Sequence, residues 1–225
     1  MDKERGTLAA AVAAASLLAA SSAFAAGGHH AVDDATILPT GECEQEDWFT
    51  RADGGERLLH ASFNCRAGPV ELGVAGEHAR GSGTSSTAWN AEVKWARELA
   101  PGLSVGANLQ PAWLAGRHPR YGMTRAVGLA TWTAARELAL HLNLGRDFVR
   151  AAPDMARHGV AADWSPMEHL TLTGERFAQD RTQFVRAGAR WQAGRWKADF
   201  SRAQRLAGPS PSNWTIGFTL DFGAE

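Results

Sequence analysis

Apolar and polar side chains alternate along much of the chain, and the alternation is most regular near its end, in residues 213–222. The large apolar side chains of this stretch share one parity: Trp214, Ile216, Phe218, Leu220 and Phe222. A period of two places them on one face of a strand and the small or polar residues between them on the other. A length of about 9–11 residues also suits a tilted strand that crosses a bilayer. The stretch therefore predicts an amphipathic strand with one apolar face.

The same alternation recurs upstream and predicts a protein built from strands. Twelve are expected, beginning near residues 43, 57, 69, 86, 103, 124, 137, 158, 168, 182, 195 and 213. Two of them are irregular, because strand 43–51 carries acidic residues on both faces and strand 124–133 has apolar residues on both parities. An even number of strands returns both ends of the chain to the same side.

The connections between the expected strands alternate between short turns and longer loops. The longer ones are expected at 115–123, 147–157, 177–181 and 203–212, whereas tryptophans precede the short turns. Outer-membrane barrels have short periplasmic turns, longer external loops and aromatic belts at both interfaces. We therefore expect two aromatic belts on the outside. They comprise Trp95, Trp132, Trp164, Trp191 and Trp196 near the turns, Trp89, Trp113 and Trp214 near the loops, and also Phe222.

From about residue 37 onward the chain resembles bacterial outer-membrane β-barrels, in particular transporter-like barrels of the MetA-pathway phenol-degradation type. The alternating last strand that ends in Phe222 is the feature that most resembles this group. The resemblance implies a closed antiparallel up-and-down transmembrane β-barrel of about 12 strands in residues 43–225, with both termini in the periplasm. It also implies that the barrel-assembly machinery, outer-membrane lipid and lipopolysaccharide are partners, and it assigns no functional residue.

A soluble β-sandwich or a lipocalin-like barrel with buried tryptophans is the alternative. It would have to bury the charged residues that lie opposite the apolar face, whereas a membrane barrel turns this face toward its lumen. We expect the lumen to be lined by Glu71, Glu92, Lys94, His141, His169, Arg186, Arg190, Lys197, Asp199 and Asp221. Ion pairs among these residues are expected to brace the barrel and to narrow any pore.

The first residues have the features of an export signal. Lys3 and Arg5 precede an apolar run, and Ala23-Phe24-Ala25 offers small residues for cleavage. Residues 1–25 are therefore predicted to be a signal peptide, with an N-terminal anchor helix as the alternative. The rest of the chain has no apolar run of 18 residues or more, so no spanning helix is expected there. The net charge of −1 gives no case for nucleic-acid binding.

The two cysteines, Cys43 and Cys65, are expected to form a disulfide. Asp53-Gly54-Gly55 is a turn signal, and a hairpin closed there pairs positions whose numbers add up to 108. Cys43 and Cys65 satisfy this sum, so they lie opposite each other on neighbouring strands. Export into an oxidising compartment favours the disulfide over two free thiols.

Residues 26–42 show no alternation and are expected to be a periplasmic or plug-like tail. Two imidazoles and two carboxylates lie close together in it: His29, His30, Asp33 and Asp34. This set of ligands suits Zn²⁺ or Cu²⁺, and a solvated flexible tail is the alternative reading. No other cofactor is expected.

Basic residues gather near the expected loops and favour anions at that mouth of the barrel, or the phosphates of lipopolysaccharide. They are Arg117, Arg120, Arg146, Arg150, Arg157, Arg176, Arg181, Arg202 and Arg205. The chain has no strong metal-protease motif, and His60 with Ser62 is only an i, i+2 pair. We therefore expect a channel or transporter for small solutes in the bacterial outer membrane, possessing an anion preference and no enzyme activity. The alternatives are a barrel linked to copper or zinc handling through the tail, or a structural or lipid-acting barrel.

Overall fold

A computed structural model of the chain describes residues 28–81 and 83–223, and the predicted signal peptide lies outside these residues. The described part contains twelve strands and no helix that is long and apolar enough to cross a membrane. The strands are β1 (Glu42–Ala52), β2 (Arg57–Ala67), β3 (Val70–Gly81), β4 (Thr84–Ala100), β5 (Leu103–Leu114), β6 (Tyr121–Ala135), β7 (Leu138–Val149), β8 (Met155–Met167), β9 (Leu170–Gln179), β10 (Thr182–Ala193), β11 (Trp196–Ala207) and β12 (Asn213–Gly223).

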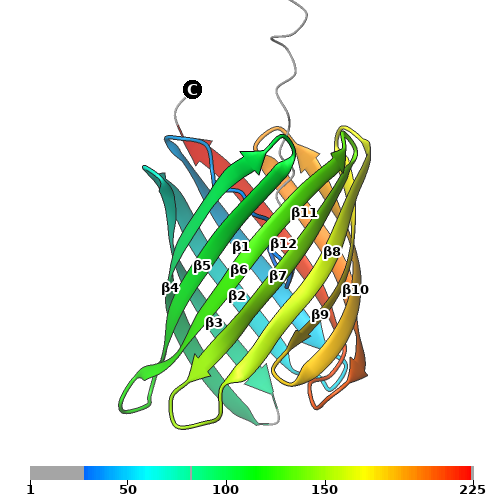
Figure 1. Ribbon diagram of the computed structural model, residues 1–225. Coiled ribbons are helices and arrows are strands. Elements are labelled where there is room, and N and C mark those ends of the chain that lie inside the picture. The colour runs from blue at the N-terminus through cyan, green and yellow to red at the C-terminus, as the bar shows by residue number, and fades with distance from the viewer. Residues whose placement is uncertain (1–27, 82, 224–225) are drawn as a thin grey trace, which may run out of the picture.

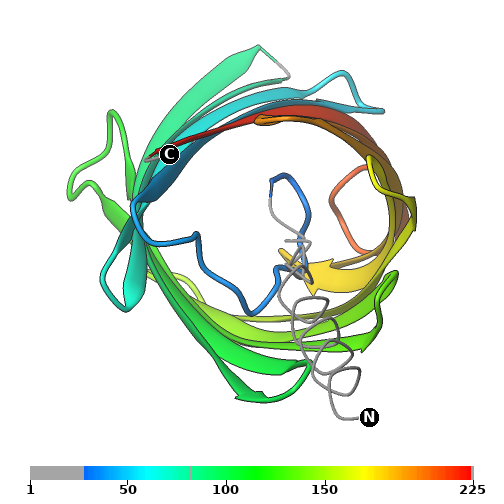
Figure 2. The ribbon, with the colours of Figure 1, turned by 90° about the horizontal axis from the view of Figure 1, so that it is seen from above.

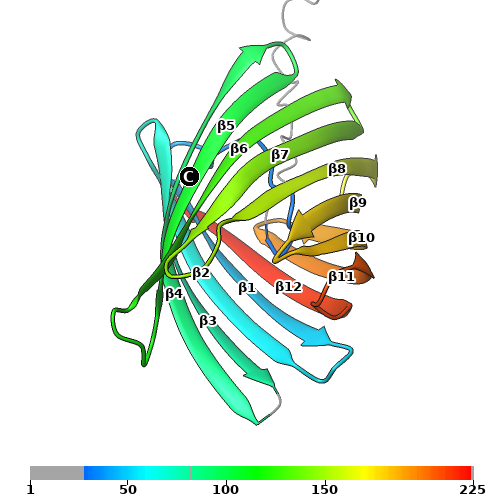
Figure 3. The ribbon, with the colours of Figure 1, turned by 60° about the horizontal axis from the view of Figure 1, so that its bottom comes forward.

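Each strand pairs with the next in an antiparallel ladder, and β1 pairs with β12 to close a barrel (Figures 1 and 3). The predicted all-β, closed, up-and-down architecture is confirmed. The strands begin close to their predicted positions, and the largest differences are at β6 and β8, which begin at Tyr121 and Met155 instead of near 124 and 158. These strands extend further than predicted because their ladders continue into the segments read as loops.

The two faces of the barrel wall differ in polarity, as a period of two requires. In β9, Leu172 is exposed on the outside, whereas Thr171, Thr173 and Glu175 are buried on the inside. In β12, Ile216 and Phe218 are exposed on the outside, and Thr215 is buried inside. The apolar groups thus cover the outer surface, and the polar and charged groups fill the interior.

The two ends of the barrel also differ. Gly223 of β12 and Glu42 of β1 are paired at the same end (Figure 1). The five hairpins at that end have two-residue connections, for example 101–102 between β4 and β5. Connections of four to six residues, including 115–120 and 208–212, are found only at the other end. The predicted asymmetry between short turns and longer loops is therefore present, although the loops are shorter than expected.

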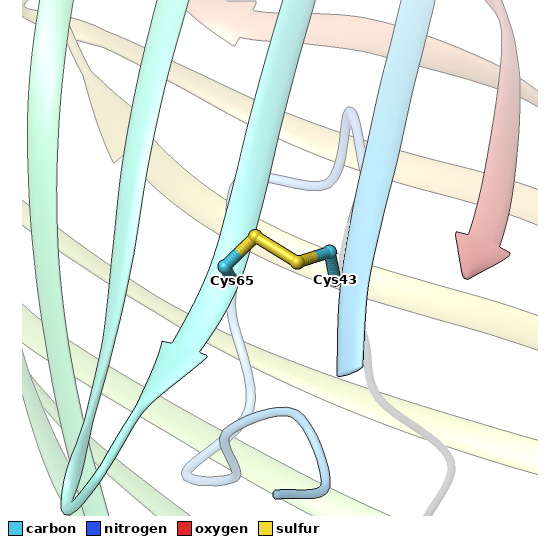
Figure 4. Close-up of a disulfide and its surroundings, with 2 residues drawn as sticks. All are labelled: Cys43 and Cys65. Carbon is cyan, nitrogen blue, oxygen red and sulfur yellow. A yellow bond between two sulfur atoms is a disulfide. The ribbon is translucent and has the colours of Figure 1, made fainter. Parts of the chain in front are cut away.

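The first hairpin has the register that the sequence predicts. Cys43 lies opposite Cys65, and the two form a disulfide between β1 and β2 (Figure 4). The irregular strand β1 turns Trp48 inward, where its ring stacks on His60 with centroids 3.4 Å apart. Its outward side chains include Gln45, which donates a hydrogen bond to Asp47. The acidic residues of β1 therefore lie on both faces, with Glu44 and Glu46 inward and Asp47 outward.

The predicted aromatic residues lie near the two ends of the barrel wall. Trp89 and Trp113 lie opposite each other near the end with the longer loops, and their rings stack 4.3 Å apart. Trp132, Trp164 and Trp191 are each more than half exposed near the end with the short turns. Trp95, Trp196 and Trp214 are exposed as well, whereas Trp113 and Phe222 are partly buried. Phe222 packs beside Phe63 of β2, with ring centroids 5.3 Å apart.

Candidate functional site: the lumen and its N-terminal segment

Residues 28–41, called the N-terminal segment below, lie inside the ring of strands (Figure 2). The segment has no regular secondary structure, and its backbone is held by inward-facing side chains of several strands. It therefore occupies part of the barrel interior. The sequence predicts either a periplasmic or a plug-like tail. The segment lies inside the barrel, as a plug does, and its entry from the periplasm stays a prediction.

Val32 anchors the segment in an apolar patch of the inner wall. It is fully buried against Ala161, Phe177 and Phe184, together with Ala203. Gly159 of β8 leaves the room for it, because a Cβ at this position would lie 2.5 Å from Val32 Cγ2. Burying a valine side chain contributes about 1.5–3 kcal/mol, so this contact is a principal anchor of the segment.

A second apolar contact joins Ala35 to β6. Ala35 is 1% exposed and packs against Val127 and Leu129, whose side chains point into the lumen. Its backbone N–H also donates to Thr131 Oγ1 at 2.8 Å. These contacts explain why strand 124–133 has apolar residues on both parities: one set covers the outside, and the other receives the segment.

Glu175 of β9 binds the backbone of the segment. Its carboxylate accepts hydrogen bonds from the N–H groups of Ala31 and Val32, the latter at 2.9 Å. Arg186 of β10 donates to Glu175 at 2.8 Å and to the carbonyl oxygen of His29 at 2.6 Å. A buried carboxylate and a buried guanidinium thus compensate each other's charge while both hold the segment.

Lys94 of β4 binds the next part of the segment. Its ammonium lies 2.9 Å from a carboxylate oxygen of Asp33 and 3.2 Å from one of Asp34. Further along, Glu71 accepts a hydrogen bond from the backbone N–H of Leu38. These contacts reach the strands opposite β9 and β10, so the segment crosses the lumen.

His29 and His30 lie next to β11 and β9. The Nε2 atom of His29 is 2.7 Å from Ser201 Oγ, and the Nδ1 atom of His30 is 3.5 Å from Glu175 Oε1. Burial, and then the nearby His30, Arg186 and Arg190, hold the pKa of His29 well below its usual range. Its imidazole is therefore neutral at pH 7. Asp33 and Asp34 bind Lys94 instead of joining the two histidines.

Most of the predicted lumen residues point inward. Glu71, Lys94, His141, Arg186 and Asp199 are buried, and Arg190, Lys197 and Asp221 form ion pairs. Lys197 binds Asp221 at 2.9 Å, and Arg190 binds Asp199 at 2.6 Å. The side chain of Glu92 accepts hydrogen bonds from Asn108 and Gln110.

His169 is different, and its prediction as a lumen residue is wrong. It lies in the exposed turn between β8 and β9, where its ring contacts Trp191 on the outside of the barrel. The alternation of this stretch was extended one residue too far toward the turn. Arg157, expected in a loop, instead lies in β8 and is buried with Asp147 at 3.2 Å.

A cavity of about 440 Å³ remains between the segment and the wall. Its lining extends from Glu44 and Glu71, near the end that carries the termini, to Thr50 and Asp180, near the other end. Among the described residues that line it, seven are acidic and four are basic. They are Asp33, Glu44, Glu46, Glu71, Glu77, Glu92 and Asp180 against Lys94, Arg125, Arg157 and Arg186.

His60 and Ser62 have separate partners on the wall of this cavity. His60 Nδ1 lies 3.1 Å from Glu77 Oε1, and Ser62 Oγ donates to the carbonyl oxygen of Glu46 at 3.4 Å. The pair needed for nucleophilic catalysis would require a hydrogen bond between the hydroxyl and the imidazole. Their arrangement instead contributes polar groups to the cavity wall.

Several inward residues were missed from the sequence. Arg125 and Arg157 both bind Asp147, and Asp163 lies 3.5 Å from His141. Their parity was available as a signal for Arg125 and Asp163, which lie in predicted strands, whereas Arg157 precedes the predicted start of β8 near 158. Phe177 was missed because residues 177–181 were expected to form a loop, whereas β9 continues to Gln179 and turns Phe177 toward Val32.

Comparisons with known proteins agree with this architecture. The profile of one family, described as "Uncharacterised conserved protein UCP029691", matches residues 14–222. No curated protein matches the sequence. A solved structure of KdgM porin superposes with a TM-score of 0.65 at 11% identity, covering 80% of this chain and 99% of that chain. KdgM porin has also been solved in complex with disordered oligogalacturonate.

Two further solved structures have the same kind of barrel. NanC porin superposes with a TM-score of 0.57 at 8% identity, covering 79% of this chain and 98% of that one. The Ralstonia pickettii toluene transporter TbuX has a TM-score of 0.50 at 10% identity, with coverages of 82% and 90%. At such low identities these similarities show the fold alone.

Proposed function

We propose that this chain, which belongs to the family described as "Uncharacterised conserved protein UCP029691", is an outer-membrane channel for small hydrophilic solutes. In this proposal the N-terminal segment narrows the lumen. Lipid covers the apolar outer wall, and lipopolysaccharide surrounds the end with the longer loops. Both termini lie in the periplasm, where the barrel-assembly machinery receives the exported chain.

The observation that carries this proposal is the polar cavity inside a closed barrel with an apolar exterior. A polar interior and a lipid-compatible surface are the properties that a transmembrane barrel channel needs. The cavity extends along the barrel beside the segment, and we infer that water and ions pass along it without removal of the segment. The porin and transporter folds among the comparisons are consistent with this role.

The charge of the path favours a hydrophilic solute. The phenol-degradation type of barrel would lead us to expect an aromatic solute, as would the toluene transporter TbuX. The cavity of this chain is lined instead by eleven charged side chains among the described residues, with additional amide and hydroxyl groups. Such a wall can form the hydrogen bonds and ion pairs that polar and charged solutes lose when they leave water. Aromatic hydrocarbons do not need these interactions.

Two sets of charges make opposite predictions about the sign of the preferred ion. Basic residues near the longer loops, such as Arg117 and Arg120, favour anions at that mouth. The acidic majority of the cavity favours cations, and selection is strongest where the path is narrow and an ion loses most of its water. We therefore expect the cavity to dominate and the channel to prefer cations.

Reconstitution into planar bilayers tests the proposal. The folded protein, identified by its heat-modifiable mobility on a gel and by fractionation with the outer membrane, is expected to give small stepwise currents in symmetrical KCl. A tenfold KCl gradient then gives the sign of the preferred ion from the reversal potential. Heat-denatured protein is the control, and a flat current from the folded barrel at all voltages contradicts the channel proposal.

A further inference from the structure

We propose that His29 and His30 of the N-terminal segment and Asp199 of β11 form a binding site for a borderline divalent metal ion such as Zn²⁺ or Cu²⁺. One possible ligand atom from each residue lies within 4.8 Å of those of the other two. Two imidazoles and one carboxylate are ligands that Zn²⁺ and Cu²⁺ accept. An ion held there would connect the segment to the barrel wall.

The histidine donors are buried and have no hydrogen-bond partner in the described part of the chain. His29 is 8% exposed, and its Nδ1 atom makes no hydrogen bond. The side chain of His30 is 3% exposed, and its Nδ1 atom also makes none. Glu175 Oε1 lies 3.5 Å from His30 Nδ1, too far for a hydrogen bond. Buried polar atoms nearly always have a hydrogen bond, so two buried nitrogens that lack one indicate a ligand that binds to them.

Neighbouring residues orient His29 for this role. Ser201 lies 2.7 Å from Nε2, and a hydroxyl that accepts from Nε2–H leaves the lone pair of Nδ1 free. Metal-bound imidazoles usually have such a partner on the other nitrogen. Gly217 of β12 lies beside Nδ1, since a Cβ there would be 3.1 Å from this atom. The backbone thus leaves space on the side of the donor.

Asp199 completes the set with one of its two oxygens. Arg190 donates to Oδ1 at 2.6 Å, which holds the carboxylate in place and leaves Oδ2 for an ion. The two rings stack with centroids 4.6 Å apart. A tetrahedral ion with bonds of about 2.0–2.1 Å needs donors about 3.3 Å apart. Binding therefore requires a small rotation of the imidazoles, which a segment without regular structure permits.

The surrounding charges limit the affinity without excluding the ion. Arg186 and Arg190 repel a cation, while Glu175 and Asp199 attract it, and each arginine is paired with one of these carboxylates. The four charges add up to zero, so the free energy of binding comes from the ligand bonds. The site differs from the set expected from the sequence, because Asp199 takes the place of Asp33 and Asp34. Metal binding at this site does not depend on conduction through the barrel.

Titration of Zn²⁺ and of Cu²⁺ into the full-length mature barrel, folded in detergent and free of a histidine tag, tests the site. We expect one ion per barrel, and an electron paramagnetic resonance spectrum of bound Cu²⁺ with coupling to two imidazole nitrogens. Loss of a residue that hydrogen-bonds to a metal ligand typically weakens metal binding about 10–100-fold. His30→Gln and Asp199→Asn each remove a ligand itself and should weaken binding by more than this. Heat-modifiable mobility verifies that each variant folds.

Two control variants locate the ion. His158→Gln removes an exposed histidine of β8, and Asp33→Asn removes a ligand of the alternative set; both should bind the ion as the parent does. The proposal is overturned if the folded parent binds no ion, or if His30→Gln binds as tightly as the parent. It is also overturned if binding depends on Asp33 and not on Asp199. All measurements are made without a membrane, so a failure of conduction leaves them unaffected.

Discussion

Lys94 of β4 and Asp34 of the N-terminal segment form a buried ion pair inside the barrel, with Nζ 3.2 Å from Oδ1. Asp33 adds a second carboxylate to the same ammonium at 2.9 Å. The lysine therefore joins the segment to a part of the wall far from the apolar pocket of Val32. Without this ion pair, the second half of the segment would be held only by the contacts of Ala35 with β6 and of Leu38 with Glu71.

Replacing this lysine should loosen the second half of the segment. Lys94→Gln leaves two carboxylates without a cation, and loss of one partner of a buried ion pair costs about 3–5 kcal/mol. We expect a larger single-channel conductance and faster proteolysis of residues 33–38. Lys197→Gln is the matched control, because Lys197 also faces the lumen but binds Asp221 of the wall. Equal conductance of Lys94→Gln and the parent would show that the ion pair does not hold the segment.

A methyl group added to Gly159 should displace Val32. Its Cβ would lie 2.5 Å from Val32 Cγ2 and 2.9 Å from Phe177 Cβ, so one of these groups must shift. Overpacking of this kind costs about 1–3 kcal/mol, and limited proteolysis of the segment should become faster. Gly174→Ala on β9 is the control, because nothing lies within 4 Å of the added atom. Val32→Ala alone should also speed proteolysis because the anchor is lost, so Gly159→Ala should have a smaller effect in this background than in the parent. An equal effect in both backgrounds would argue against this contact.

Neutralising acidic residues of the cavity should reduce the preference for cations. Glu46→Gln with Glu92→Gln removes two of the seven acidic side chains that line it, at nearly constant volume. The reversal potential in a tenfold KCl gradient should move toward the value for an unselective channel. Glu137→Gln, in the exposed turn between β6 and β7, serves as the control. An unchanged potential in the double variant would place selection at the loops instead.

Removing the disulfide should weaken the first hairpin, β1 and β2, next to the pairing of β1 with β12 that closes the barrel. Cys43 and Cys65 are 22 residues apart in the sequence, and a crosslink of this loop length contributes about 3 kcal/mol. Cys43→Ser with Cys65→Ser should lower the temperature at which the heat-modifiable band unfolds. Reductant should lower it for the parent and leave the double variant unchanged. The prediction would be contradicted by a parent that is insensitive to reductant and no more stable than the double variant.

The barrel could be predicted because strand alternation is a local property. A period of two assigns each side chain to one face, and a short turn sets the register of its hairpin, so Cys43 and Cys65 were placed opposite each other without a structure. Twelve starting positions followed from the same pattern. The exceptions lie where alternation weakens at strand ends, as at His169 and at the beginning of β8.

The sequence by itself thus determined the strands, their faces, the disulfide and most of the polar lining, because each depends on residues close together in the chain. Only the tertiary structure decided what fills the lumen. Closure of β1 onto β12 places the strands β4, β6, β9, β10 and β11 around one space. The N-terminal segment forms hydrogen bonds, ion pairs and apolar contacts with the side chains that meet there. Val127, Leu129 and Phe177 turn inward to receive it, and Asp199 comes to lie beside His29 although 170 positions separate them in the numbering. No local period encodes such contacts, because they exist only once the barrel has closed.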